Sequence, residues 1–254
     1  AHTHRRVLHV KDRTGQAVVD FLNEQVNQRD NVIHQRGIRV TQIWVEGGKC
    51  EGVQVLDGPT LRWIKAKAVV LATGGGGHLF ANTTNPTQAA GEGVALAWRA
   101  GAVIEDLEFF QFHPTALKLD GAPSFLISEA LRGEGAVLVD SFGKSPVEHL
   151  EGKDLAPRDQ VSRALFKAMQ KQKVDYMGLN LQSISVQDVE GRFPSIFQRC
   201  RDFGLDPLKE FLPVAPSAHY WMGGVSTNLR AETNIKGLFA IGEVACTGLH
   251  GANR

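Results

Sequence analysis

The sequence predicts an α/β fold with an inserted segment of mixed α+β structure, and three observations lead to this prediction. Residues 67–73 form a continuous apolar run rich in β-branched side chains, which is typical of a strand covered on both faces. Residues 238–241 form a second short apolar run. The segments 16–27 and 160–170 carry apolar residues at helical spacing. We therefore expect the two strands to share one layer, with residues from about 107 to 220 inserted between them.

The composition is that of an ordinary globular protein and excludes several classes of function. Of the 254 residues, 43% are hydrophobic and 22% are charged, and the net charge of +1 gives no indication of a nucleic-acid surface. No apolar run approaches the ~18 residues needed to span a bilayer, and no signal peptide is present. Cys50, Cys200 and Cys246 lie far apart, without metal-ligand spacing. We therefore expect no metal site, no nucleic-acid partner, no membrane segment and a reducing, cytoplasmic location.

The first third of the chain predicts one helix followed by a small β meander. Thr14 and Gly15 precede the helical segment 16–27. Strand-like pieces follow at residues 31–34, 37–45 and 51–56, and glycines at 47, 48, 52 and 58 separate them. This arrangement indicates hairpins rather than a βαβ unit.

Four consecutive glycines, at positions 74–77, directly follow the buried strand and its last residue, Thr73. Such a run indicates a close pass of the backbone by a phosphate, a ribose or a flavin ring. The alternative is a mobile loop without a ligand. A complete G-x-G-x-x-G fingerprint followed by an acidic residue is not present, so the glycines alone do not identify a dinucleotide site.

A helix is predicted at residues 94–100, opened by Gly91, Glu92 and Gly93 and closed by Gly101. Glu92 complements the positive end of the helix dipole. It either does only that or also holds a ligand hydroxyl.

The inserted segment begins and ends with extended stretches that each carry a histidine. His113 stands before Pro114 among aromatic residues, and His219 lies in the proline-stiffened stretch 212–224. A lone histidine beside phenylalanine is more often a structural residue than a ligand. The two histidines nevertheless mark both junctions of the insert, and we expect groups at these junctions to meet.

Between these stretches the insert predicts a strand-to-helix turn and two helices. Residues 124–131 form the turn, and Ser128, Glu129 and Arg132 read by themselves as a solvated turn. Pro157, Arg158 and Asp159 open the helix at 160–170, with Asp159 as its capping or first-turn acid. A further helix is predicted at 193–203.

The last stretch of the chain runs from a strand into small, polar and charged residues that cannot form a core. Glu243 stands where the strand ends, the place where open α/β sheets put ligand contacts. Gly242, Gly248 and Gly251 permit a close backbone approach, and Arg254 is the last residue. A frayed tail is the alternative, but a strand leads directly into this stretch. We therefore expect a ligand-binding site whose sequence motif is interrupted by the end of this chain.

Six motifs, in the same order across most of the chain, resemble the succinate dehydrogenase/fumarate reductase flavoprotein family. They are Ala-Thr-Gly-Gly (72–75), Gln-Phe-His-Pro-Thr (111–115), Arg-Gly-Glu-Gly (132–135), Pro-Arg-Asp (157–159), His-Tyr-x-Met-Gly-Gly (219–224) and Gly-Glu-x-x-x-x-Gly-x-His-Gly-Ala-Asn-Arg (242–254). The resemblance implies part of a Rossmann-like FAD-binding domain with an inserted capping domain. The implied boundaries are 1–106 for the FAD-binding part with its meander, 107–220 for the capping domain and 221–254 for the return segment.

The resemblance also implies roles for individual residues. Arg158 matches the catalytic acid/base, and non-covalent FAD is the implied cofactor. The residues implied to bind the substrate are His113, Ser128, Glu129, Arg132, His219 and Arg254. The residues implied to bind the cofactor are Thr73, Gly74, Gly75, Glu92, Gly242 and Glu243.

Within the family, the motifs are most similar to the branch that oxidises L-aspartate to iminoaspartate, the first step of quinolinate and NAD biosynthesis. The implied partners are L-aspartate or another C4 dicarboxylate, oxygen or fumarate as electron acceptor, and quinolinate synthase. Hydride transfer to a flavin requires a clamped substrate, and arginine binds carboxylates bidentately. The alternatives are a flavoprotein subunit of succinate dehydrogenase or fumarate reductase, and a binding remnant without cofactor.

The sequence departs from the family pattern in three places. The dinucleotide motif for the ADP half of FAD and an acidic residue for the substrate's amino group are not in this sequence, nothing follows Arg254, and Lys-Ser-Pro-Val (144–147) replaces Glu-Arg-Phe-Met. Because the first residue is also not Met, we expect a partial chain that by itself binds FAD weakly or not at all and is inactive.

Overall fold

The computed structural model describes residues 8–119, 121–185 and 187–251, and the chain divides into two compact units. Unit 1 comprises residues 1–35, 117–156 and 163–215, and unit 2 comprises residues 36–116, 157–162 and 216–254. Each unit is therefore assembled from separate stretches of the chain. The domain boundaries implied by the sequence stay a prediction.

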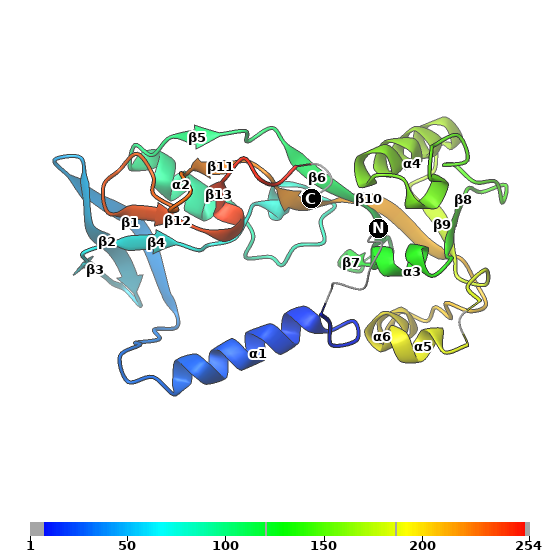
Figure 1. The fold of residues 1–254 in the computed structure, drawn as a ribbon, viewed down its shortest axis with the longest axis horizontal. Coiled ribbons are helices and arrows are strands. Elements are labelled where there is room, and N and C mark those ends of the chain that lie inside the picture. Colours follow the sequence, from blue (N-terminus) through cyan, green and yellow to red (C-terminus); the bar gives the residue numbers. More distant parts are fainter. Residues whose placement is uncertain (1–7, 120, 186, 252–254) are drawn as a thin grey trace. The chain divides into compact units, whose positions relative to one another are not determined.

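Unit 2 begins with the β meander. Strands β1 (Ile38–Glu46), β2 (Lys49–Asp57) and β3 (Thr60–Lys65) form an antiparallel sheet in that order (Figure 1). The strand predicted at residues 31–34 is wrong: this segment is irregular, and Ile33 is 83% exposed. The third strand is β3 instead, because the turn at Gly58 returns the chain along β2 and fills that edge.

The two apolar strands share one layer, as predicted. Strand β4 (Val69–Leu71) pairs in parallel with β12 (Leu238–Ala240), with Val69 opposite Leu238 and Leu71 opposite Ala240. The predicted helix is α2 (Glu92–Arg99), and Gly101, at φ 90°, follows its C-cap. The short strands β13 (Ala245–Cys246), β11 (Gly224–Ser226) and β5 (Ile104–Glu105) form a further sheet in that order.

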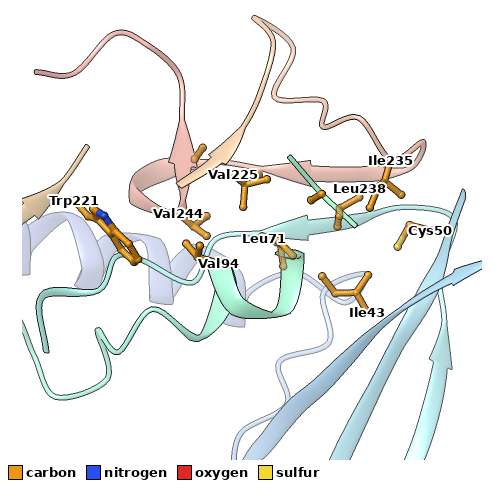
Figure 2. Close-up of a cluster of buried hydrophobic side chains, with 13 residues drawn as sticks. Ile43, Cys50, Leu71, Val94, Trp221, Val225, Ile235, Leu238 and Val244 are labelled. Carbon is orange, nitrogen blue, oxygen red and sulfur yellow. The ribbon is translucent and has the colours of Figure 1, made fainter. Parts of the chain in front are cut away.

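One hydrophobic core joins these elements of unit 2. Figure 2 shows Leu71 of β4, Leu238 of β12, Val94 of α2 and Val225 of β11 around it, all at most 5% exposed. Burying each of these side chains contributes about 1.5–3 kcal/mol. The core thus holds together two stretches of chain, 71–94 and 225–238, that are distant in the sequence.

Two long strands belong to both units. Strand β6 (Phe110–Leu117) begins in unit 2 and ends at the first residue of a unit 1 stretch, and β10 (Leu212–Trp221) begins in unit 1 and ends in unit 2. They are neighbours in the same sheet. Both extended stretches predicted around the histidines are therefore strands.

Unit 1 contains most of the helices. Its strands β8 (Val137–Val139), β9 (Met177–Asn180) and β10 pair antiparallel in that order, with Leu179 between Leu138 and Leu212. Asp12 accepts hydrogen bonds from the backbone N (2.7 Å) and the hydroxyl (3.1 Å) of Ser195, in the first turn of α6 (Pro194–Asp202). Burial raises the pKa of the Cys200 thiol to about 11.

The helices and strands of unit 1 follow in chain order. The elements are α1 (Thr14–Asn27), β7 (Phe125–Leu126), α3 (Glu129–Gly133), β8 (Val137–Val139), the 3₁₀ helix η2 (Lys153–Leu155), α4 (Arg158–Gln172, whose first five residues belong to unit 2), β9 (Met177–Asn180), α5 (Val189–Arg192) and α6 (Pro194–Asp202).

The helices predicted near residues 16, 160 and 193 are confirmed as α1, α4 and α6. Helix α1 buries none of its residues. Within the part of the chain that the structure describes, no helix is long and apolar enough to cross a membrane.

Candidate functional site

The carboxyl ends of β4 and β12 form one edge of the layer in unit 2, and we call this the carboxyl edge. The amide of Ile241 donates to the carbonyl of Leu71 at 2.9 Å, so the pairing extends to the end of both strands. Thr73 and Gly74 follow β4, and Gly242 follows β12. Ligands of open α/β sheets bind at such an edge. The structure therefore brings together two groups of predicted cofactor residues.

The glycine run at this edge serves two different purposes. A methyl group at Gly76 would lie 2.5 Å from the Trp221 ring, one at Gly75 would overlap the Glu243 carboxylate, and one at Gly77 would overlap the side chain of Asn85. Gly74, at φ 74°, has no such neighbour. Three of the four glycines are thus required by the protein's own packing, and Gly74 leaves room for a ligand.

Gly242 resembles Gly74 rather than the packed glycines at positions 75–77. Its φ is 69°, and a methyl group there would meet nothing within 4 Å. It opens the 3₁₀ helix η3 (Gly242–Val244), which the chain enters directly from β12. The two open glycines therefore follow closely after the ends of the two neighbouring parallel strands.

Glu243 connects the carboxyl edge to strand β10. Its Oε1 accepts a hydrogen bond from the backbone N of Trp221 at 2.8 Å, and its carboxylate packs over Gly75. The indole Nε1 of Trp221 donates to the carbonyl of Leu107 at 2.9 Å. Glu243 therefore stabilises the protein itself, and the contact to FAD that the sequence implied for it stays a prediction.

Glu92 is the first residue of α2 and lies beside the carboxyl edge. The amide of Gly91 donates to the carbonyl of Gly75 at 3.1 Å, and Gly93 packs against Thr73. The Glu92 carboxylate pairs with Arg39 at 2.6 Å, and both side chains are more than half exposed. Together with Arg99 they line a shallow pocket of about 280 Å³. The predicted dipole position of Glu92 is confirmed.

The two histidines predicted at the junctions lie together in unit 2. The ring centroids of His113 and His219 are 5.2 Å apart, with the planes at 64°. His113 is 1% exposed, and its Nδ1 accepts a hydrogen bond from the amide of Thr115 at 3.3 Å. The Nδ1 of His219 is 2.8 Å from the hydroxyl of Thr84. We call these two residues the histidine pair; its role in binding a substrate stays a prediction.

Arg158 is connected to the strand that carries His113. Its Nη1 donates to Gln111 Oε1 at 3.1 Å, and Gln111 is 2% exposed. The Nε2 of Gln111 donates to the carbonyl of Gly251 at 3.3 Å. In the same first turns of α4, the hydroxyl of Ser162 donates to the carbonyl of Phe112 at 3.0 Å. One amide side chain thus joins Arg158 to the final segment.

Sequence reasoning did not single out Gln111 and Thr84 as site residues. A signal existed for Gln111, because an amide between Phe110 and Phe112 on a strand needs a polar partner when it is buried. For Thr84 the sequence shows only a polar loop. Arg254, the remaining predicted substrate residue of the final segment, lies outside the described residues.

Ser128, Glu129 and Arg132 belong to unit 1, so their predicted role beside the histidine pair stays a prediction. Ser128 caps α3 by accepting from the amide of Ala130 at 3.2 Å. Arg132 is 2% exposed and donates to the carbonyl of Asp154.

Asp154 itself ties this turn to the next strand. Its carboxylate accepts from the amide of Leu138 at 2.7 Å. Burial raises the pKa of Asp154, although this hydrogen bond and the charge of Arg132 oppose the rise. The turn is therefore an internally bonded part of unit 1.

The comparisons with known proteins agree with this arrangement. A family model described as an FAD binding domain matches residues 1–254. The chain belongs to the FAD binding domain family. The predicted α/β fold and FAD as its cofactor are thereby confirmed.

The similar proteins are flavoproteins of the predicted kind, which confirms the resemblance. An L-aspartate oxidase of Nostoc sp. is 49% identical over 100% of this chain and 45% of its own length. An L-aspartate oxidase of Bacillus subtilis is 43% identical over 100% of this chain and 47% of its own. A mutant E. coli quinol fumarate reductase structure has a TM-score of 0.87 and 34% identity, covering 98% of this chain and 46% of that one. The chain spans about half the length of the curated relatives it matches.

The carboxyl edge fits a flavin nucleotide on its own geometry. Gly74 and Gly242 leave the backbone open where the two strands end. The first turn of α2 packs against Thr73, and a helix N-terminus favours phosphate oxygens. Thr73, Gly74 and Gly242 therefore stand where a cofactor could approach, and their role in holding FAD stays a prediction.

Proposed function

We propose that the protein to which this chain belongs oxidises L-aspartate to iminoaspartate with FAD. The observation that carries the proposal is that the histidine pair, Arg158 and the open carboxyl edge all belong to unit 2. The names of the relatives from Nostoc sp. and Bacillus subtilis support the choice of L-aspartate. The proposal concerns the whole protein, because the relatives are about twice as long as this chain.

The chemistry divides between the cofactor and the chain. Bound FAD supplies the acceptor for the hydride that leaves Cα of the substrate. The histidine pair supplies ring N–H donors for one carboxylate of the substrate, since an imidazole nitrogen that carries hydrogen donates to oxygen. Because His113 is almost fully buried, a carboxylate bound there is removed from water, which strengthens the hydrogen bonds to it.

Arg158 is proposed as the residue that exchanges a proton with the substrate. Guanidinium is normally always charged, so this role requires surroundings that do not add to its stability as a cation. Gln111 accepts a hydrogen bond from Arg158 Nη1 without contributing a negative charge. The neutral amide therefore orients the guanidinium without adding a charge to the site.

Further proposals concern the surroundings of the reaction. Oxygen or fumarate would reoxidise the flavin, and we place the reaction in the cytoplasm. Because an imine is hydrolysed in water, an enzyme that consumes iminoaspartate at once is required; quinolinate synthase, in NAD biosynthesis, is the proposed partner.

Anaerobic reduction of the flavin by substrate tests the proposal. The full-length protein, purified with FAD, is mixed with L-aspartate or with succinate, and the loss of flavin absorbance is followed. Rapid bleaching by L-aspartate and slow or no bleaching by succinate is the expected result. Arg158→Met should lower the rate of bleaching by about 10²–10⁴-fold, the usual contribution of a general acid or base. His113→Ala should weaken binding of L-aspartate, and full activity of this variant would contradict the site.

A second candidate is a flavoprotein subunit of succinate dehydrogenase or fumarate reductase. The TM-score of 0.87 to the quinol fumarate reductase favours it. Rapid bleaching by succinate, with none by L-aspartate, would establish this function instead. A full-length protein that binds no flavin would leave the third possibility, a binding remnant.

A further inference from the structure

Residues 82–85, which we call the threonine loop, are fixed against strand β10 beside His219. The amide of Ala218 donates to the carbonyl of Asn82 at 2.9 Å, and the amide of Thr84 donates back to the carbonyl of Ala218 at 3.0 Å. The hydroxyl of Thr83 lies 3.0 Å from the same carbonyl and 3.1 Å from Oδ1 of Asn85. The loop is thus held in register with the residue that precedes His219.

Two distances indicate where the hydroxyl hydrogen of Thr84 points. The carbonyl of Ala218 already accepts from the amide of Thr84, and the Thr83 hydroxyl lies 3.0 Å from it and 3.1 Å from Oδ1 of Asn85. The Thr84 hydroxyl is 3.5 Å from this carbonyl but 2.8 Å from Nδ1 of His219. The hydroxyl therefore donates to Nδ1 of His219.

A nitrogen that accepts a hydrogen bond carries no hydrogen, so neutral His219 has its hydrogen on Nε2. His113 reaches the same state by another contact. Its Nδ1 accepts from the backbone amide of Thr115, which can only donate. The two rings, 5.2 Å apart, therefore carry the same tautomer.

Two neutral Nε2–H groups suit the two oxygens of one carboxylate. Two imidazolium ions at this separation would repel each other, whereas two neutral rings do not. Donation by Thr84 and Thr115 thus supplies the pair of donors without requiring two adjacent positive charges.

We propose that Thr84 is a positioning residue that fixes His219 as the Nε2–H tautomer, so that the histidine pair binds a substrate carboxylate through two neutral donors. The part of this inference that concerns the carboxylate rests on the proposed function. The part that concerns the tautomer of His219 does not.

The kinetic test compares three single substitutions in the full-length protein with FAD. Thr84→Val removes the hydroxyl at nearly the same volume, and Thr84→Ser retains it. Thr87→Val is the matched control, because it makes the same threonine-to-valine change at an exposed position three residues away. Thr84→Val should raise KM for L-aspartate about tenfold, the effect of one lost neutral hydrogen bond, with kcat and FAD affinity within about twofold. Thr84→Ser should keep KM within about threefold, and Thr87→Val should leave it unchanged.

A Thr84→Val protein that loses FAD or unfolds would show a structural role instead, and Thr84→Ser then decides. Since serine keeps the donor, a large rise of KM in Thr84→Ser with normal flavin content would overturn the proposal. An unchanged KM in a folded Thr84→Val protein would overturn it as well.

Nuclear magnetic resonance tests the tautomer without turnover. The full-length protein is labelled with ¹⁵N at histidine, and the His219 signals are identified by their loss in His219→Gln. We expect an unprotonated Nδ1 and a protonated Nε2 in the wild type and in Thr84→Ser, and a mixture in Thr84→Val. A protonated Nδ1 in the wild type would overturn the inference whatever the substrate is. The expected tautomer together with no oxidation of L-aspartate would reject the proposed function and keep the role of Thr84.

Discussion

The packed and the open parts of the carboxyl edge differ in what occupies the space beside their glycines. Gly75, Gly76 and Gly77 meet Glu243, Trp221 and Asn85, whereas Gly74 and Gly242 meet nothing within 4 Å. The packed glycines allow side chains from β10, η3 and the threonine loop to fix the edge. The open glycines are the part of the edge that a cofactor can approach. A run of glycines can therefore combine a packing role with a binding role, and substitutions should separate the two.

The largest loss of stability is expected for Gly76→Ala. The added methyl group would lie 2.5 Å from the indole of Trp221, which is held by hydrogen bonds from its backbone N and from Nε1. We expect a loss of about 1–3 kcal/mol, as for other overpacked sites, measured by thermal unfolding of the full-length protein. In a Trp221→Leu background the same substitution should have a smaller effect. Equal losses of stability in both backgrounds would show that the Trp221 ring is not the reason for a glycine at position 76.

Glu243→Ala should be the next most destabilising change. It removes the acceptor of the Trp221 amide, and an unsatisfied, partly buried amide costs about 1–3 kcal/mol. It also opens the space over Gly75, so Gly75→Ala should be tolerated in the Glu243→Ala background and harmful in the wild type. The two single variants and the double variant are compared by thermal unfolding. Additive losses would contradict the packing assigned to Gly75.

Substitutions at the open glycines should affect FAD more than stability. Gly74→Ala and Gly242→Ala place an L-residue at positive φ, at a cost of about 1–2 kcal/mol. Gly58→Ala is the matched control, because Gly58 has φ 56° and open space in the turn between β2 and β3. All three should lose similar stability, but only Gly74→Ala and Gly242→Ala should weaken FAD binding, by about tenfold, in a fluorescence titration. Equal FAD affinity in all three variants would place the cofactor elsewhere.

The smallest effect is expected for Glu92→Gln. Its ion pair with Arg39 is more than half exposed on both sides, and such pairs contribute about 0–1 kcal/mol. Thermal unfolding should therefore change little. The same variant separates the two roles that the sequence left open for Glu92. A clear loss of FAD affinity in the titration indicates a cofactor contact, and an unchanged affinity indicates that Glu92 only complements the helix dipole.

Local sequence patterns predicted most elements, because their causes are local. Apolar residues at helical spacing predicted α1, α4 and α6, and Gly101 predicted the end of α2. The apolar runs at Val69 and Leu238 predicted β4 and β12 as parts of one layer. The strand expected at residues 31–34 failed because a short apolar run forms a strand only where a neighbouring strand accepts its hydrogen bonds.

For the candidate site, the sequence by itself determined which residue types are available and where they stand relative to strand ends. It identified His113, His219, Arg158 and the glycines of the carboxyl edge. Only the tertiary structure decided which of them meet, because β6, β10 and the start of α4 come together from distant parts of the chain. The contacts of Gln111 with Arg158 and of Thr84 with His219 each join residues far apart in the sequence. No local pattern encodes such contacts, since they depend on the packing of whole strands and on the register in which the threonine loop meets β10.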